Sequence, residues 1–111
     1  MSDISDELPV LYLTTMGRTS GLPRQIEIWF VTTGGRYYLL AEHFRRANWV
    51  RNIECNPRVQ LRVGEQDRGA TARVLDETAD SETWRLAQDL ARRKYGWGEG
   101  LPVEITPDQP F

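Results

Sequence analysis

Three side chains that carry or can carry positive charge lie close together near the middle of the chain. His43, Arg45 and Arg46 fall at the start of a segment whose apolar residues repeat with helical spacing. The start of a helix already carries partial positive charge and unpaired N–H groups, so cations gathered there call for an anion. Guanidinium groups donate charge-assisted hydrogen bonds to phosphates and carboxylates. The segment is a candidate phosphate or carboxylate site, unless Glu42 or Asp residues elsewhere pair with the arginines on a solvated face.

A second set of anion donors lies in the short loop GRTSG at residues 17–21. The loop combines two glycines with the hydroxyls of Thr19 and Ser20 and the guanidinium of Arg18, and Arg24 follows just beyond it. Such a loop can present backbone N–H groups and side-chain donors to an anion. It can equally be a plain connection between two strands, so the sequence leaves both interpretations open.

Two tryptophans lie near these donors along the chain. Trp29 shares one face of a predicted strand with Gln25 and Glu27, and Trp49 falls in the first turns of the predicted helix. Flat apolar surface beside cationic donors suits a planar ring that bears an anionic tail. Ordinary core packing is the alternative for either tryptophan taken singly.

The residue patterns of the common catalytic and metal sites are absent from the sequence. It contains no Walker loop, no GxSxG and no HExxH, and nothing marks Cys55 and His43 as a nucleophile and its base. Cys55 is the only cysteine, so no disulfide can form within the chain, and the companion ligands of a structural zinc site are missing. We therefore expect no metal site and a reducing, cytoplasmic location.

Composition places the chain among ordinary globular domains. It has 111 residues, 40% of them hydrophobic, and a formal net charge of −2, from 14 basic and 16 acidic side chains. A chain of this length can bury a core in one domain, expected to span residues 1–111. The negative net charge argues against nucleic-acid binding, and neither a secretory leader nor an apolar stretch long enough to span a bilayer is visible.

Periodicity and turn residues predict the elements that carry these side chains. Residues 24–33 alternate with period two, Gly34-Gly35 is typical of a tight hairpin, and Pro57 ends the helix before it. Strands are predicted at residues 9–15, 24–33, 36–43, 58–64 and 69–76, helices at residues 45–56 and 80–95, and an irregular tail at residues 97–111. The order βββαββα indicates a mainly β, α+β fold, a small β-barrel with two helices packed on its outside.

Several motifs in this order resemble one known family. Residues 13–24, LTTMGRTSGLPR, resemble the LTTxGRxSGxPR segment of the split β-barrel deazaflavin-dependent oxidoreductases, also called the deazaflavin-dependent nitroreductase family. Trp49, Asn52 and residues 56–59 are similar to the family's W-x-x-N-x-x-x-NPxV pattern, and residues 72–74 to its AR-containing strand. The resemblance extends over residues 11–95.

The resemblance implies a split β-barrel related to the FMN-binding pyridoxamine-phosphate oxidase folds. It also implies an enzyme that binds coenzyme F420, with FMN as the alternative, and transfers a hydride to an electron-poor acceptor. Quinones, nitro compounds and activated alkenes are the acceptors expected. Such a transfer needs alignment and exclusion of water more than a protein nucleophile, which suits a sequence without the usual catalytic motifs.

Site residues follow from the resemblance position by position. They are Arg18 and Arg24 on the coenzyme tail, Trp29 facing the deazaflavin, Ala41 and His43 beside the phosphate, and Trp49 and Asn52 on the covering helix. Thr19, Ser20, Arg45 and Arg46 complete the predicted cofactor-binding set. Tyr95 is the preferred proton donor, with Tyr38 or solvent as alternatives, and Trp97 is expected to line the substrate side.

The chain also departs from the family's pattern. Glu42 stands where the characterised nitroreductases carry a serine, the segment between His43 and Trp49 is shorter, and Thr19 replaces a frequent lysine. A second hypothesis is therefore a non-catalytic split-barrel module that sequesters FMN or haem, with His43 as the available ligand. Because the family's fold relatives commonly pair, a homodimer in which a second subunit completes the site is expected.

Overall fold

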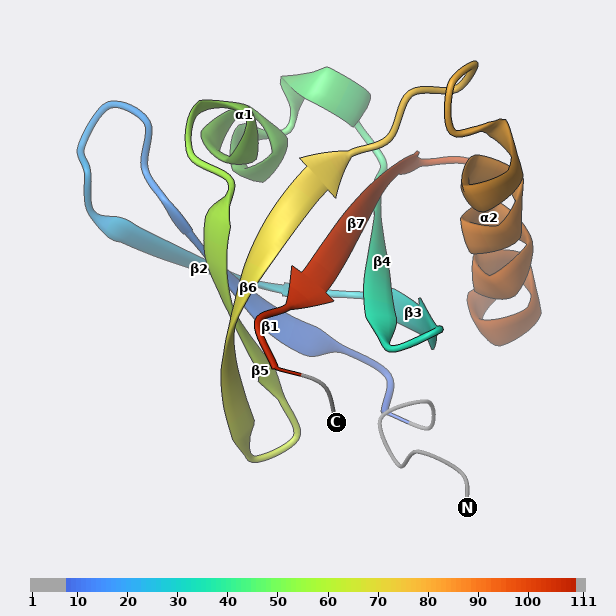
Figure 1. The fold of residues 1–111 in the computed structure, drawn as a ribbon, viewed down its shortest axis with the longest axis horizontal. Helices are drawn as coiled ribbons and strands as arrows, with labels where there is room; N and C mark the ends of the chain where they lie inside the picture. The colour runs from blue at the N-terminus through green and yellow to red at the C-terminus, as the bar shows by residue number, and fades with distance from the viewer. Residues whose placement is uncertain (1–7, 110–111) are drawn as a thin grey trace.

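Seven antiparallel strands form the centre of the molecule, which a computed structural model describes from residue 8 to residue 109 (Figure 1). The strands are β1 Leu11–Met16, β2 Pro23–Ile28, β3 Phe30–Thr33, β4 Arg36–Ala41, β5 Arg58–Val63, β6 Gln66–Val74 and β7 Leu101–Pro107. The helices are the 3₁₀ turn η2 Phe44–Arg46, α1 Asn48–Cys55 and α2 Ser81–Tyr95. The mainly β architecture with two α-helices agrees with the fold class predicted from the sequence.

One chain segment provides both ends of the sheet. The strand order is β2-β1-β5-β6-β7-β4-β3, so β2 and β3 lie at opposite edges although only Trp29 separates them in the chain. β2 pairs with β1, and β3 pairs with β4. The single strand predicted at residues 24–33 is therefore broken at Trp29, where it changes partner and closes the sheet into a barrel. Phe30 and Val31 are both buried, with 1% and 4% of their surface exposed, which regular alternation does not allow.

The helices cover the barrel at one end and along one side (Figure 1). α1 packs against β1 and β6 and buries Val50, Asn52 and Ile53, whereas α2 packs against β3 and β7 and buries Trp84, Ala87 and Ala91. The β5–β6 hairpin lies at the end of the barrel opposite α1. No helix within residues 8–109 is long and apolar enough to cross a membrane.

The prediction of an irregular tail at residues 97–111 is wrong. β7 lies between β6 and β4 in the sheet, and its Val103 and Ile105 are fully buried. Pro102 and Pro107 misled the prediction because proline weakens a central strand. Both lie near the strand's ends, and the Pro102 carbonyl still accepts a hydrogen bond from the Leu75 N–H at 3.1 Å. Residues 110–111 of the predicted tail lie outside the described residues, and so do residues 1–7 at the amino terminus.

The first predicted helix also starts later than residue 45. Phe44–Arg46 forms a separate 3₁₀ turn, Ala47 is extended with φ −64° and ψ 132°, and α1 begins at Asn48. Phe44 has a positive φ of 52°, a backbone conformation unsuited to the start of an α-helix. The cations His43, Arg45 and Arg46 therefore precede α1 rather than occupy its first turn.

A buried carboxylate joins three neighbouring strands on the side of the sheet away from Ile105. Glu104 on β7 lies opposite Tyr38 on β4 and Arg73 on β6. The Tyr38 hydroxyl donates to Glu104 Oε2 at 3.0 Å, and Arg73 Nη2 donates to Glu104 Oε1 at 3.4 Å. Burial, followed by the charge of Glu104, raises the pKa of Tyr38. The Tyr38 hydroxyl therefore stays protonated and donates its hydrogen bond to Glu104.

The position of β7 predicts a large difference between two adjacent substitutions. Ile105→Ala removes a fully buried side chain and should lower the free energy of unfolding by about 2–5 kcal/mol through lost burial and a cavity. Thr106→Ala, at the next and exposed position, should change it by no more than about 0.5 kcal/mol. Urea unfolding monitored by tryptophan fluorescence measures both, and equal stability of the two variants would contradict the central place of β7.

Candidate functional site

Two adjoining cavities open on the barrel, one bordered by residues of α1 and α2 and the other by residues of α1. The first, here the aromatic cavity, has a volume of about 900 Å³, and the second, here the arginine cavity, about 770 Å³. Ile26 on β2 and Trp49 on α1 line both, so they form the wall between the cavities. Volumes of this size are typical of small-molecule and cofactor sites.

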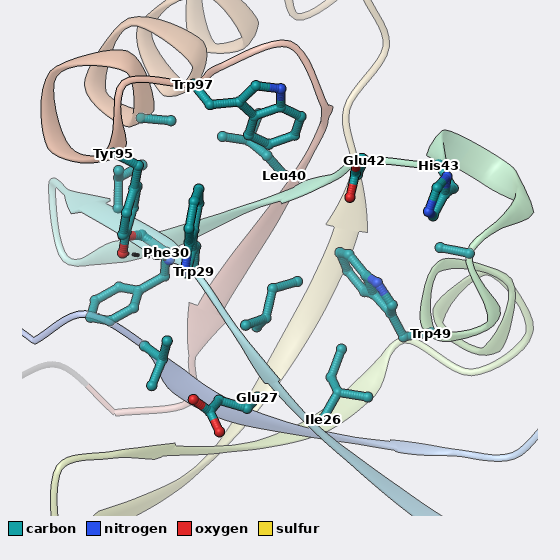
Figure 2. A pocket seen from close by; sticks show the side chains of 15 residues that line it. Ile26, Glu27, Trp29, Phe30, Leu40, Glu42, His43, Trp49, Tyr95 and Trp97 are labelled. Atoms are coloured by element: carbon teal, nitrogen blue, oxygen red, sulfur yellow. Dashed lines mark hydrogen bonds between the residues drawn. The ribbon is translucent and has the colours of Figure 1, made fainter.

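Three tryptophans from three parts of the chain line the aromatic cavity (Figure 2). Trp29 comes from the bend between β2 and β3, Trp49 from α1, and Trp97 from the segment that follows α2. Trp29 is 47% exposed, so a broad face of its ring is open to a ligand. The charged side chains of this lining are Glu27 and Glu42, and no Arg or Lys belongs to it.

Tyr95 fixes the bend that carries Trp29. Its ring stacks on that of Trp29, with centroids 4.4 Å apart and planes 4° from parallel. The Phe30 N–H donates to the Tyr95 hydroxyl at 3.1 Å, and the hydroxyl oxygen lies 2.8 Å from the carbonyl oxygens of Phe30 and Pro9. Lys94 Nζ also donates to the Phe30 carbonyl at 3.0 Å. The end of α2 therefore holds the point where the strand changes partner.

These contacts bear on the proton-donor role predicted for Tyr95. Burial raises the pKa of its hydroxyl, and the hydroxyl hydrogen has backbone carbonyls as its partners. To protonate an acceptor, the hydroxyl would have to leave them. The role stays a prediction. The alternative donor Tyr38 is bound to Glu104 and lines neither cavity.

The arginine cavity is built around the loop between β1 and β2. Arg18, Thr19, Ser20 and Arg24 line it, together with residues of α1. Gly17 permits the tight loop, because a Cβ at that position would lie 2.5 Å from Ser20 Oγ. No acidic side chain belongs to this lining, so its charge is opposite to that of the aromatic cavity.

An asparagine on α1 positions the Arg18 guanidinium. Asn52, only 4% exposed, accepts hydrogen bonds from the Arg18 backbone N–H at 3.1 Å and from Arg18 Nη1 at 2.9 Å. Its own amide donates to Thr15 Oγ1 at 3.1 Å. Asn48, one helical turn earlier, accepts from Arg18 Nη2 at 3.2 Å. Sequence reasoning missed Asn48, although its spacing of four residues from Asn52 places both on one helix face.

Arg24 differs from Arg18 in having no hydrogen-bond or ion-pair partner within the described part of the chain. Among residues 8–109 no side chain forms a hydrogen bond or ion pair with its guanidinium, which is exposed at the cavity rim. Its charge is therefore open to a ligand.

The structure brings together most, but not all, of the predicted site residues. Arg18, Thr19, Ser20, Arg24, Trp49 and Asn52 line the arginine cavity, and Trp29, His43, Trp49, Tyr95 and Trp97 line the aromatic cavity. Ala41, Arg45 and Arg46 line neither. Ala41 is buried opposite Leu101, and Arg45 forms an ion pair with Glu54, the kind of surface pairing that the sequence left open.

Removal of the Tyr95 hydroxyl tests its structural part. Tyr95→Phe keeps the ring stack but leaves the buried backbone N–H of Phe30 without its acceptor. The free energy of unfolding should fall by about 1–3 kcal/mol. Thermal unfolding compared with Tyr12→Phe, whose side chain is exposed, measures the effect. Equal stability of both variants would contradict a structural role of the hydrogen bonds between the Tyr95 hydroxyl and the Phe30 backbone. Lost turnover at unchanged stability would favour proton donation by Tyr95.

The fold is a split β-barrel with two adjoining cavities of opposite charge. Residues 3–106 match the family model described as F420H(2)-dependent quinone reductase, so the chain belongs to this family. It is 25% identical over 92 residues to an F420H(2)-dependent quinone reductase of Mycobacterium tuberculosis. That match covers 78% of this chain and 62% of the relative, so the chain spans about three-fifths of its curated relatives' length.

Solved structures give the same fold. A structure titled F420-H2 dependent reductase (FDR-A) is 26% identical with a TM-score of 0.66, and the match covers 87% of this chain and 92% of that one. A domain-swapped dimer is also 26% identical, with a TM-score of 0.63 and coverage of 87% and 78%. The haem storage protein HutZ from Vibrio cholerae, at 22% identity, TM-score 0.77 and coverage of 96% and 86%, shares the fold alone.

Proposed function

We propose that this protein is an oxidoreductase that uses reduced coenzyme F420 to reduce quinones and other electron-poor acceptors. One observation carries the proposal: a cationic cavity without acids adjoins an aromatic cavity without Arg or Lys, across the shared wall of Ile26 and Trp49. A ligand with a flat ring and an anionic tail meets both environments at once. The family to which the chain belongs supports the same activity.

The residues present fit a deazaflavin coenzyme. Arg18 and Arg24 would hold its phosphate or tail carboxylates, and Asn52 keeps the Arg18 guanidinium in place. Trp29 and Trp49 offer planar apolar surface to its ring. When bound, the reduced coenzyme supplies a hydride to the acceptor, and one further proton completes the two-electron reduction of a quinone to a hydroquinone.

The protein's own contribution is binding, alignment and exclusion of water. The Trp29–Tyr95 stack fixes one wall against which a ring can lie. Apolar side chains such as Ile26, Leu40 and Trp97 line the space beside it and keep it poor in water (Figure 2). Alignment of donor and acceptor at van der Waals distance is the main requirement of hydride transfer, so no protein nucleophile is needed.

Coenzyme binding is tested by fluorescence titration with oxidised coenzyme F420, run beside FMN at the same salt concentration. Arg24→Ala and Arg18→Ala should each weaken F420 binding by about tenfold or more, because each removes a charged donor. Arg62→Ala, an exposed arginine of β5 that lines neither cavity, is the matched control. Tighter binding of FMN than of F420 would leave the fold assignment unchanged but would show that the coenzyme is FMN.

Turnover is tested separately by following the oxidation of reduced F420 after a quinone is added. Failure with a broad panel of acceptors, despite tight coenzyme binding, would instead support the alternative of a sequestering module. Titration with haem distinguishes that case further, since ligation by His43 would give a Soret band.

We also propose that two copies associate as a homodimer and act in the cytoplasm. Leu22, Trp29 and Phe44 are large apolar side chains left exposed on the chain, and a relative forms a domain-swapped dimer. Cys55 as the only cysteine fits a reducing compartment. Sedimentation equilibrium at micromolar concentration should give twice the chain mass, and a clean monomer would refute the dimer.

A further inference from the structure

Resting on the proposed function, we infer that Glu42 makes the aromatic cavity discriminate against anionic acceptors. Neutral and cationic quinones are then the substrates of this chain, and quinones that carry a sulfonate or carboxylate are poor ones. The inference concerns the acceptor, whereas coenzyme binding depends on the arginine cavity, so the two can fail independently.

The carboxylate of Glu42 belongs to the cavity wall. Glu42 follows the end of β4 directly, and Figure 2 shows its carboxyl group turned toward the space between Trp97 and Trp49. Glu27, on β2, also belongs to the lining, but Figure 2 shows its carboxyl group directed away from Glu42. Glu42 is therefore the acidic side chain whose carboxylate faces the space.

The Glu42 carboxylate has no partner in the part of the chain that the structure describes. Among residues 8–109 no hydrogen bond or ion pair engages the side-chain carboxylate of Glu42 or that of Glu27. The nearby cation Arg45 is paired with Glu54, and Lys94 donates to the Phe30 carbonyl and lies over the Phe30 ring. His43 is the remaining side chain of basic type in the lining, and it forms no ion pair with Glu42 within residues 8–109. The charge of Glu42 therefore has no ion-pair partner in the described part of the lining.

Glu42 is exposed at the mouth of the cavity, where its carboxylate lies beside the apolar walls. Charges beside low-dielectric walls are less screened than charges on an open surface, so an anionic group brought among them is repelled. A neutral quinone bears no such penalty. Unfavourable charge against the wrong ligand is a common source of specificity, because it costs the preferred ligand nothing.

The experiment compares 1,4-naphthoquinone with 1,4-naphthoquinone-2-sulfonate as acceptors for reduced F420. For each protein we take the ratio of kcat/KM for the neutral quinone to kcat/KM for the anionic quinone. Comparing this ratio between wild type and variant cancels the intrinsic reactivity of the two quinones. Glu42→Gln should lower this ratio by about three- to tenfold, and Glu42→Lys should lower it further. The effect should shrink at high salt, as an electrostatic effect does.

Glu65→Gln is the matched control. Glu65 lies in the turn of the β5–β6 hairpin, is exposed and lines neither cavity, yet the substitution removes the same charge. Its ratio should equal that of the wild type. A ratio unchanged in Glu42→Gln, or lowered equally in Glu65→Gln, would overturn the inference.

A second readout needs neither coenzyme nor turnover. Both quinones quench tryptophan fluorescence, and three tryptophans line the cavity, so quenching reports acceptor binding directly. Binding of the sulfonate should tighten about three- to tenfold in Glu42→Gln relative to the neutral quinone. If wild type reduces neither quinone, the proposed activity has failed, and the quenching titration still decides whether Glu42 repels anions.

Discussion

The barrel and its site both depend on the backbone groups of Phe30. At this residue the chain leaves β1 as a partner and joins β4, and the residue is buried. A buried N–H or carbonyl without a partner costs about 1–3 kcal/mol, so a change of partner in the interior needs a substitute donor and acceptor. The Tyr95 hydroxyl provides both, and Lys94 adds a second donor to the carbonyl. Because Trp29 stacks on Tyr95, the same contact that closes the sheet also sets one wall of the aromatic cavity.

The second cavity is organised by hydrogen bonds rather than by stacking. Asn52 is buried and joins Thr15 on β1 to Arg18 in the following loop, so α1, β1 and the loop form one unit. Each site thus has a rigid support: α2 for the aromatic cavity and α1 for the arginine cavity. The two linings carry opposite charges: Arg18 lies on the loop held by α1 and Arg24 at the start of β2, whereas Glu27 lies near the end of β2 and Glu42 directly after β4.

Local sequence predicted well what local sequence determines. The period-two runs, the Gly34-Gly35 hairpin and the second helix all correspond to observed elements, and Arg18, Trp49 and Asn52 line one cavity, while their role in binding stays a prediction. The rest depended on long-range contacts. β7 was missed because its prolines argue against a strand, whereas its central place follows from pairing with β4 and β6. The break at Trp29 likewise depends on Tyr95, which lies more than 60 residues away in the chain. The separate turn before α1 arises because the backbone of Ala47 is extended.

The wall shared by the two cavities also sets the distance between the contacts that a ligand can make in each. Ile26 and Trp49 separate the arginines from the tryptophans, and both are held by rigid elements, one by β2 and the other by α1. A molecule that contacts Arg24 and lies on Trp29 must cross this wall, and β2, which begins beside Arg24 and ends just before Trp29, fixes how far apart those two contacts are. The fold therefore sets a minimum length for the linker between a ligand's ring and its anionic group. A molecule with a suitable ring and anionic group but a shorter linker reaches only one of the two cavities.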